Sequence, residues 1–190
     1  MKLSLSHSRG FTLVEILIVI SIIGILMTMS LFPFKSYMDR SALRQSKDEI
    51  SQEWILSHKA VRNGLQFEKD DINTPNVDEG KHAFVLFAFE PKSSIIELSL
   101  VRESDPSQWI HKKPYKTIEL KRGIEVIGFS GSTNPGDILY YLITPPYASG
   151  TFYENTTALT QDDVILTIGY PGYSKTSGRQ KEIYLRPYLH

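Results

Sequence analysis

Cysteine is absent from all 190 residues, and the formal net charge is zero. The lack of cysteine excludes disulfide bonds, thiol nucleophiles and cysteine-based metal sites. The balance of 21 basic and 21 acidic residues creates no overall field toward nucleic acid or an anionic membrane surface, so no nucleic-acid partner is expected. The chain has room for one membrane segment and one modest globular domain, whose core must stand without covalent help.

Charge is also missing from Ile16 to Phe34, a run long enough to cross a bilayer. Glu15 lies directly before this run. An acidic residue deep in a membrane helix costs roughly 2.5–3.5 kcal/mol on insertion scales, so Glu15 requires a functional explanation. The run is too long for a secretory signal core, and no Ala-x-Ala pattern follows it before Lys35. The remaining alternatives are a plain signal anchor and a segment cleaved on the near side of the run.

The motif at residues 9–15, RGFTLVE, favours cleavage on the near side. It resembles the processing motif of the type IV prepilin family, in which a basic leader, a glycine, a methylatable phenylalanine and a glutamate precede an apolar helix. The resemblance implies cleavage between Gly10 and Phe11, followed by N-methylation of Phe11. It also implies that Glu15 pairs with the terminal amine of a neighbouring subunit and so sets the axial register. Glycine before the scissile bond removes steric obstruction because it has no Cβ.

The same resemblance implies partners and a location. The chain would be the substrate of a prepilin peptidase and methyltransferase, and would then contact other pilin or pseudopilin subunits, an inner-membrane assembly platform and, before assembly, membrane lipid. The implied topology is a single pass through the inner membrane, with a cytoplasmic leader and a C-terminal domain in the periplasm or outside the cell. Lys2 and Arg9 in the leader agree with this orientation, although the far flank is also basic.

A second helical pattern follows the apolar run. Leu43, Ile50, Trp54, Val61 and Leu65 recur at spacings of seven and four, which predicts an amphipathic helix. Asn63-Gly64 predicts its end, since Gly64 can adopt a left-handed conformation. Pro33 removes one hydrogen bond of the helical ladder and predicts a kink.

Beyond Gly64 the pattern changes to short apolar or alternating runs separated by turn residues, which predicts strands. The expected strands are Ala83–Phe89, Ile96–Leu100, Thr117–Leu120, Ile124–Phe129, Asp137–Thr144, Val164–Ile168 and Glu182–Arg186. Arg122-Gly123 is expected to join two of them as a hairpin, and Glu68–Lys81 is expected to be a long loop.

These elements predict an α+β fold in which a long N-terminal helix packs on an antiparallel β domain. We expect a leader at residues 1–10, a membrane and assembly helix at 11–34, its amphipathic continuation at 35–64, and a β-rich domain at 65–190. From Ile124 onward, the order of strands and turns is similar to that of minor pilins and of the H-type minor pseudopilin of type II secretion.

Residues that could carry other chemistry do not form a recognised site. The acidic pairs Asp70-Asp71 and Asp162-Asp163 lack the spacing of a calcium loop, and we interpret them as solvated or capping acids. No two histidines have metal-ligand spacing, and no nucleophile motif is present, so no metal, cofactor or enzymatic activity is expected. Of the tyrosines, three are expected in loops where they could contact partners: Tyr147, Tyr153 and Tyr173.

The leading hypothesis is a structural subunit, either a minor pilin or a pseudopilin, of a type IV pilus, a type II secretion system or a related filament. The alternative is a membrane-anchored adhesin-like module whose β domain binds a ligand. Trp54 is expected to anchor the helix stripe in the core, so its truncation should be severe. Trp109, in the polar stretch 105–113, is expected to tolerate the same change.

Overall fold

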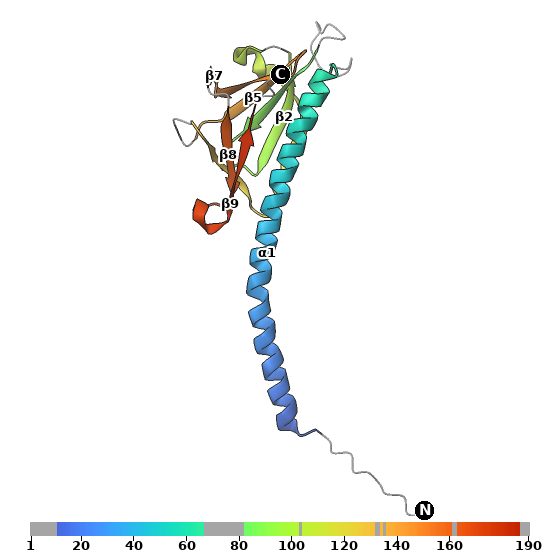
Figure 1. Ribbon diagram of the computed structural model, residues 1–190, viewed down its shortest axis with the longest axis vertical. Helices are drawn as coiled ribbons and strands as arrows, with labels where there is room; N and C mark the ends of the chain where they lie inside the picture. The colour runs from blue at the N-terminus through green and yellow to red at the C-terminus, as the bar shows by residue number, and fades with distance from the viewer. Residues whose placement is uncertain are drawn as a thin grey trace, which may run out of the picture. The chain divides into compact units, whose positions relative to one another are not determined.

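The computed structural model describes residues 11–66, 82–102, 104–131, 134, 136–160 and 163–186. The chain divides into two compact units, Met1–Asp39 and Arg40–His190. Helix α1, Leu13–Arg62, contributes to both units, and all strands belong to the second (Figure 1). The expected α+β class is confirmed.

Helix α1 ends as the sequence predicts. The Leu65 N–H donates to the Ala60 carbonyl and the Gly64 N–H donates to the Val61 carbonyl, both at 3.0 Å. Gly64 has a φ of 82°. These two bonds and the left-handed glycine form a Schellman motif, which satisfies carbonyls that the last helical turn leaves unpaired. The helical assignment continues through Pro33, and a bend at this residue stays a prediction.

The part of α1 within the second unit packs on the β domain through the predicted stripe. Leu43, Ile50, Trp54 and Val61 are all buried, with at most 6% of the surface of each exposed. Leu65 is partly buried and packs against the same core. The inner faces of the strands therefore cover the apolar face of the helix, as the spacing of these residues predicts.

Two antiparallel sheets make up the β domain. The six-stranded sheet has the order β3-β2-β1-β5-β6-β7, and the three-stranded sheet has the order β4-β8-β9. The first contains β1 (Phe84–Phe89), β2 (Ile95–Val101), β3 (Lys113–Glu119), β5 (Leu139–Thr144), β6 (Ser149–Glu154) and β7 (Thr157–Ala158). The second contains β4 (Glu125–Phe129), β8 (Val164–Gly169) and β9 (Gln180–Leu185).

One apolar core joins the helix and both sheets. It includes Phe87 and Tyr141 from the larger sheet and Leu166 and Ile183 from the smaller one, together with Trp54 of α1. The turn between β1 and β2 links the sheets as well, because the Lys92 N–H donates to the Val126 carbonyl of β4 at 2.8 Å. The two sheets are therefore parts of one folded domain.

Each of the seven predicted strands corresponds to a strand of the structure, although their ends differ. The largest shift is in β3, which begins at Lys113 rather than at Thr117. Strands β6 and β7 and the 3-10 helices η1 (Pro106–His111) and η2 (Lys175–Ser177) were not expected. The segment Glu68–Lys81, which was expected to be a loop, lies wholly outside the described residues.

The expected hairpin at Arg122-Gly123 is wrong. Both residues have positive φ, 61° and 72°, so a tight turn does form. However, β3 pairs with β2 and β4 pairs with β8, so the strands on either side belong to different sheets. The turn moves the chain between sheets instead of pairing its neighbours.

The position of Trp109 does not support the expectation that it tolerates truncation. Trp109 is only 7% exposed and forms a second apolar cluster with Leu86, Val101 and Leu142. This cluster lies on the side of the large sheet that faces away from α1. Helix η1 brings Trp109 there, because the Asp105 carboxylate caps it by accepting the Ser107 N–H at 2.9 Å.

Candidate processing and assembly site

Thr12 and Glu15 cap the start of α1 reciprocally. Oε2 of Glu15 accepts the Thr12 backbone N–H at 2.8 Å and the Thr12 hydroxyl at 2.9 Å. In return, Oγ1 of Thr12 accepts the Glu15 N–H at 3.3 Å. This is the capping box, in which a threonine at the N-cap and a glutamate three residues later satisfy two backbone donors that the first turn leaves unpaired.

The capping box gives Glu15 a role within its own subunit that the sequence reasoning missed. The pattern Thr-x-x-Glu at 12–15 was the available signal. All atoms of the box lie on the far side of the Gly10–Phe11 bond, so cleavage there would leave it intact. Gly10 itself lies outside the described residues, while Phe11 is 84% exposed.

The apolar segment after Glu15 presents its side chains outward on all sides. Its large apolar residues from Ile16 to Met29 are each about half or more exposed within the chain. Its polar groups are satisfied internally, because the Ser21 hydroxyl donates to the Leu17 carbonyl and the Thr28 hydroxyl to the Ile25 carbonyl, both at 2.8 Å. The segment is long and apolar enough to span a membrane.

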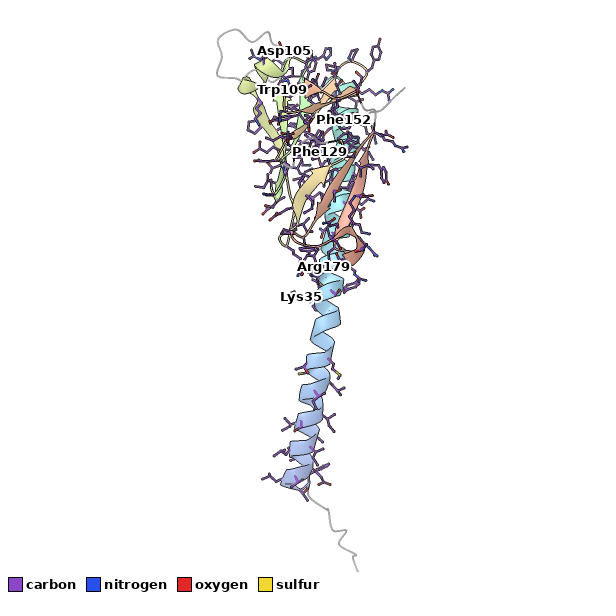
Figure 2. The ribbon with its side chains drawn as sticks, turned by 90° about the vertical axis from the view of Figure 1, so that its left-hand side faces the viewer. Lys35, Asp105, Trp109, Phe129, Phe152 and Arg179 are labelled. Carbon is purple, nitrogen blue, oxygen red and sulfur yellow. The ribbon has the colours of Figure 1, made fainter. Side chains whose placement is uncertain are left out.

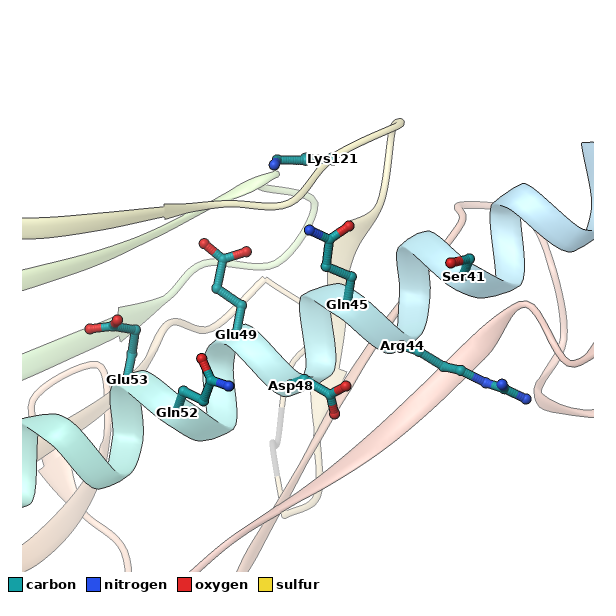
Figure 3. A pocket seen from close by; sticks show the side chains of 8 residues that line it. All are labelled: Ser41, Arg44, Gln45, Asp48, Glu49, Gln52, Glu53 and Lys121. Carbon is teal, nitrogen blue, oxygen red and sulfur yellow. The ribbon is translucent and has the colours of Figure 1, made fainter.

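Within the second unit, a polar pocket of about 640 Å³ lies between α1 and the β3–β4 turn. Gln45 and Glu49 extend from α1 on the side of Lys121, whereas Arg44 points away from it (Figure 3). Glu53 in the pocket wall forms an ion pair with Lys116 of β3 at 2.5 Å. The pocket lining carries charges of both signs, so it offers no uniform field for one kind of ion. The described residues that line it include no histidine, which would be the usual general base near neutral pH.

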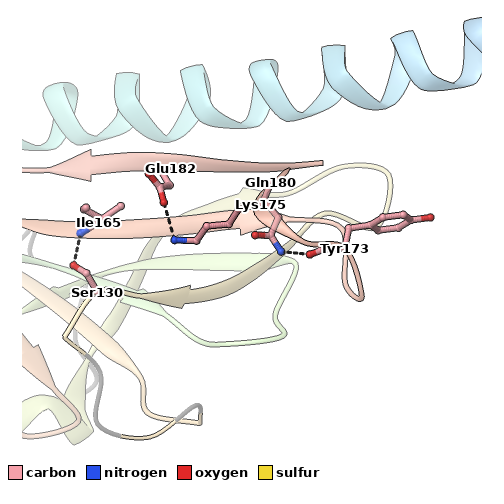
Figure 4. A network of polar contacts seen from close by, with 6 residues as sticks. All are labelled: Ser130, Ile165, Tyr173, Lys175, Gln180 and Glu182. Atoms are coloured by element: carbon pink, nitrogen blue, oxygen red, sulfur yellow. Dashed lines mark hydrogen bonds and ion pairs between the residues drawn. The ribbon is translucent and has the colours of Figure 1, made fainter. Parts of the chain in front are cut away.

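A second pocket of about 280 Å³ lies over the three-stranded sheet and the η2 loop. Figure 4 shows its polar contacts: the Ser130 hydroxyl accepts the Ile165 N–H at 2.8 Å, and Lys175 pairs with Glu182 at 2.8 Å. The Gln180 side-chain amide donates to the Tyr173 carbonyl. The Lys175–Glu182 and Gln180–Tyr173 bonds tie the η2 loop to β9.

One buried polar pair lies inside the core and was not identified from the sequence. His58 is 4% exposed, and its Nε2 lies 2.9 Å from the Tyr141 hydroxyl. The spacing of His58 from Trp54, one helical turn, was the signal that placed it on the buried face. This pair contributes to the core and is not open to solvent.

The other sequence candidates remain apart. Among the described residues, no group of three or more histidine, aspartate or glutamate side chains is placed to hold a metal ion. Asp163 pairs with Arg186 at 3.3 Å, while Asp70, Asp71 and Asp162 lie outside the described residues. Tyr147 and Tyr173 are exposed as expected, but Tyr153 lies in β6 and packs on Trp109.

Comparisons with known proteins agree with the N-terminal motif. Residues 5–31 match the family model described as the prokaryotic N-terminal methylation motif. The chain is also similar to the type IV major fimbrial protein FimA of Dichelobacter nodosus, with 29% identity over 96 residues. That alignment covers 49% of this chain and 60% of the fimbrial protein, so the chain spans less than two thirds of this relative. No solved structure matches the chain.

The methylation motif, the fimbrial relative and the long helix packed on antiparallel sheets all point to one family. The motif covers the segment that contains Phe11, Thr12 and Glu15. The helix supplies both the candidate membrane span and the amphipathic half that the β domain covers. On these grounds the chain is similar to type IV pilin-like proteins, in its N-terminal motif and in the packing of a long helix on antiparallel sheets.

Proposed function

We propose that the chain is a structural subunit of a type IV pilus, a type II secretion system or a related filament, acting as a minor pilin or pseudopilin. The observation that carries this proposal is the combination of the capped helix start at Thr12–Glu15 with an apolar segment whose side chains are exposed on all sides. Exposed apolar surface of this extent requires lipid before assembly and neighbouring helices after it.

Processing comes first in the proposed sequence of events. A prepilin peptidase cleaves between Gly10 and Phe11, and a methyltransferase modifies the new amine of Phe11. The chain is thus a substrate of these enzymes. The methylated amine remains a cation, and it lies close to the start of α1, where the helix dipole favours anions rather than cations.

Assembly follows from this electrostatic conflict. Within one subunit, Oε2 of Glu15 already accepts the two Thr12 donors, and no described residue donates a hydrogen bond to its other oxygen. A carboxylate has two oxygens and about four acceptor positions, so it can cap its own helix and still accept a donor from outside. We therefore propose that Glu15 pairs with the methylated amine of a neighbouring subunit and fixes the axial register.

Mass spectrometry of protein extracted from membranes that contain a prepilin peptidase tests the processing step. The expected mature chain begins at N-methyl-Phe11. A Gly10→Val variant should stay unprocessed because a branched side chain obstructs the scissile bond, while Ser8→Ala should be processed normally. A mature chain that begins at Met1, or one that begins inside the apolar run, would contradict the proposal.

A further inference from the structure

Basic residues gather in two stretches that are distant in the sequence. Residues 35–47 of α1 contain four basic residues and one acidic residue, Asp39, and helix acids resume at Asp48. Residues 170–182, around η2, contain three basic residues and one acidic residue, Glu182. Because the whole chain is neutral, the remainder carries a matching excess of acid. The excess of positive charge in these two stretches is therefore local, and it has no role in the assembly proposed above.

The fold brings these stretches to one end of the second unit. Figures 1 and 2 both show the η2 loop at the end of the β domain where α1 enters the second unit, which begins at Arg40. Figure 2 shows Arg179 at this end and Asp105 and Trp109 at the opposite one. We call the side chains of Arg40, Arg44, Lys175, Arg179 and Lys181 the basic surface. Both arginines of α1 are exposed.

The η2 loop holds its part of this surface in a defined form. The Arg179 guanidinium lies 4.2 Å from the ring centroid of Tyr173, which is 44% exposed. Lys175 is held by Glu182 at 2.8 Å, and Gly178 closes the loop with a φ of 68°. An exposed tyrosine stacked with an arginine resembles the aromatic and basic residues that occupy membrane–water interfaces.

The candidate membrane span determines what surface lies nearby. The apolar run ends at Phe34, and Arg40 begins the second unit six residues later. Six residues extend at most about 20 Å, so Arg40 stays within this reach of the end of the run in any arrangement of the two units. In the proposed topology, the start of the second unit at Arg40 therefore lies within this distance of one face of the bilayer.

We propose that the basic surface binds anionic phospholipid headgroups of the membrane that α1 crosses, and so holds the β domain against the bilayer before assembly. Guanidinium groups donate two parallel hydrogen bonds to a phosphate, and ammonium groups add point charges. Clusters of basic residues beside a membrane helix are attracted to anionic lipid within about a Debye length. The inference rests on the membrane segment of the proposed function.

The test uses the full chain in lipid nanodiscs. Because the chain has no cysteine, a single Thr176→Cys substitution in η2 allows one fluorophore to be attached cleanly. The discs contain phosphatidylcholine with a headgroup nitroxide quencher, with or without about 30% phosphatidylglycerol. We expect quenching to rise roughly twofold with the anionic lipid, and the rise to disappear at about 0.5 M salt, where the Debye length is only a few ångströms.

Two sets of substitutions distinguish an effect of the basic surface from an effect of the total charge of the domain. The combination Lys175→Gln, Arg179→Gln and Lys181→Gln should abolish the rise in quenching. The combination Arg102→Gln, Lys112→Gln and Lys113→Gln removes the same charge near η1, at the other end of the domain, and should leave the rise unchanged. A fluorophore on Ser107→Cys in η1 should show no dependence on lipid charge. Thermal melts establish that each variant is folded.

The outcomes distinguish this inference from the function on which it rests. If the chain does not enter nanodiscs of either composition, the membrane segment and the inference are both wrong. If it enters both equally, but quenching at residue 176 does not depend on lipid charge, the inference alone is wrong. Saturable binding of a short double-stranded DNA by the basic surface, with no lipid effect, would overturn the assignment to lipid and identify the nucleic-acid backbone as the ligand.

Discussion

The Tyr141 hydroxyl donates a hydrogen bond to Nε2 of His58 across 2.9 Å inside the core. Nδ1 of His58 lies 2.7 Å from the Trp54 carbonyl, which can only accept, so Nδ1 carries the proton and Nε2 accepts when the ring is neutral. Burial lowers the pKa of His58 from its ordinary value and raises that of the Tyr141 hydroxyl. The pair therefore specifies a neutral histidine in the folded state.

The lowered pKa of His58 predicts that the folded chain loses stability in acid. Its pKa is lower in the folded chain than in the unfolded chain, so the unfolded chain takes up protons first as the pH falls below about 6.5. Stability should fall from that pH downward until the folded histidine titrates as well. Thermal melts of the full chain in detergent between about pH 5 and pH 8 measure this effect.

A His58→Gln variant should lose part of this dependence, while a His82→Gln variant, at an exposed position, should keep it. The same dependence in His58→Gln as in the unaltered chain would show that another group is responsible. Tyr141→Phe leaves Nε2 without its donor, and we expect it to cost about 1–3 kcal/mol at neutral pH.

Trp54→Ala and Trp109→Ala should both destabilise the chain. The Trp54 ring stacks on Tyr141 with centroids 4.0 Å apart and also contacts Phe87 at 5.3 Å. Trp109 meets Tyr140 and Tyr153 edge-on at 5.3 and 5.1 Å. Truncation of a buried tryptophan costs about 3–5 kcal/mol, and we expect the larger loss at Trp54 because it belongs to the main core.

The exposed Tyr147 provides the control for the tryptophan pair. It is 73% exposed, so Tyr147→Ala should change the free energy of unfolding by no more than about 0.5 kcal/mol. Thermal melts of the three variants under one condition give the comparison. Equal stability of Trp109→Ala and Tyr147→Ala would show that the cluster under η1 does not form.

Gly150→Ala should be severe for a steric reason. A Cβ on Gly150 would lie 1.8 Å from the Tyr141 hydroxyl oxygen and 2.1 Å from its ring carbon Cζ. The ring must then move, and it would lose both the bond to His58 and its packing on Trp54. Overpacking alone costs about 1–3 kcal/mol. Gly136→Ala, where no atom lies within 4 Å of the added Cβ, is the matched control and should melt close to the unaltered chain.

Substitutions at the start of α1 separate capping from charge. Glu15→Gln keeps an acceptor at the third helical position and so keeps the capping box, but it removes the charge proposed to pair with a neighbouring amine. Thr12→Ala removes the cap, at a cost of about 0.5–2 kcal/mol, and keeps the charge. We expect filament or complex incorporation to fall sharply in Glu15→Gln and less in Thr12→Ala.

Incorporation is measured as the sheared or co-purified fraction of each variant relative to its amount in the membrane. Glu15→Ala removes both contributions and should match Glu15→Gln if charge dominates. Normal incorporation of Glu15→Gln with failure of Thr12→Ala would mean that Glu15 acts through its own helix, and the pairing between subunits would be discarded.

The sequence predicted the long helix well because its signals are local. The apolar stripe through Leu43, Ile50 and Trp54 reflects helical periodicity, and the Schellman end at Gly64 depends only on adjacent residues. The pairing of strands depends on distant residues instead. For this reason a correct turn at Arg122-Gly123 was interpreted as a hairpin, although it leads from one sheet to the other.

Trp109 and β6 were misjudged for related reasons. Asp105 and Ser107 near Trp109 are polar and exposed, whereas the Trp109 ring is buried against the sheet below. Strand β6 begins with Ser149, Gly150 and Thr151, which have little apolar character. Gly150 is required there because the Tyr141 ring from the neighbouring strand occupies the space above it. This requirement becomes visible only when both strands are in place.

The bond between His58 and Tyr141 joins residues that are 83 positions apart in the chain. Translation at about 5–20 residues per second delivers the second residue on the order of ten seconds after the first. During this interval only β1 to β4 are available to cover the apolar face of the helix, and the stacking of Tyr141 on Trp54 is missing; contacts between such distant residues form slowly. The apolar face of the nascent helix is therefore not fully covered until strand β5, which carries Tyr141, has been synthesised.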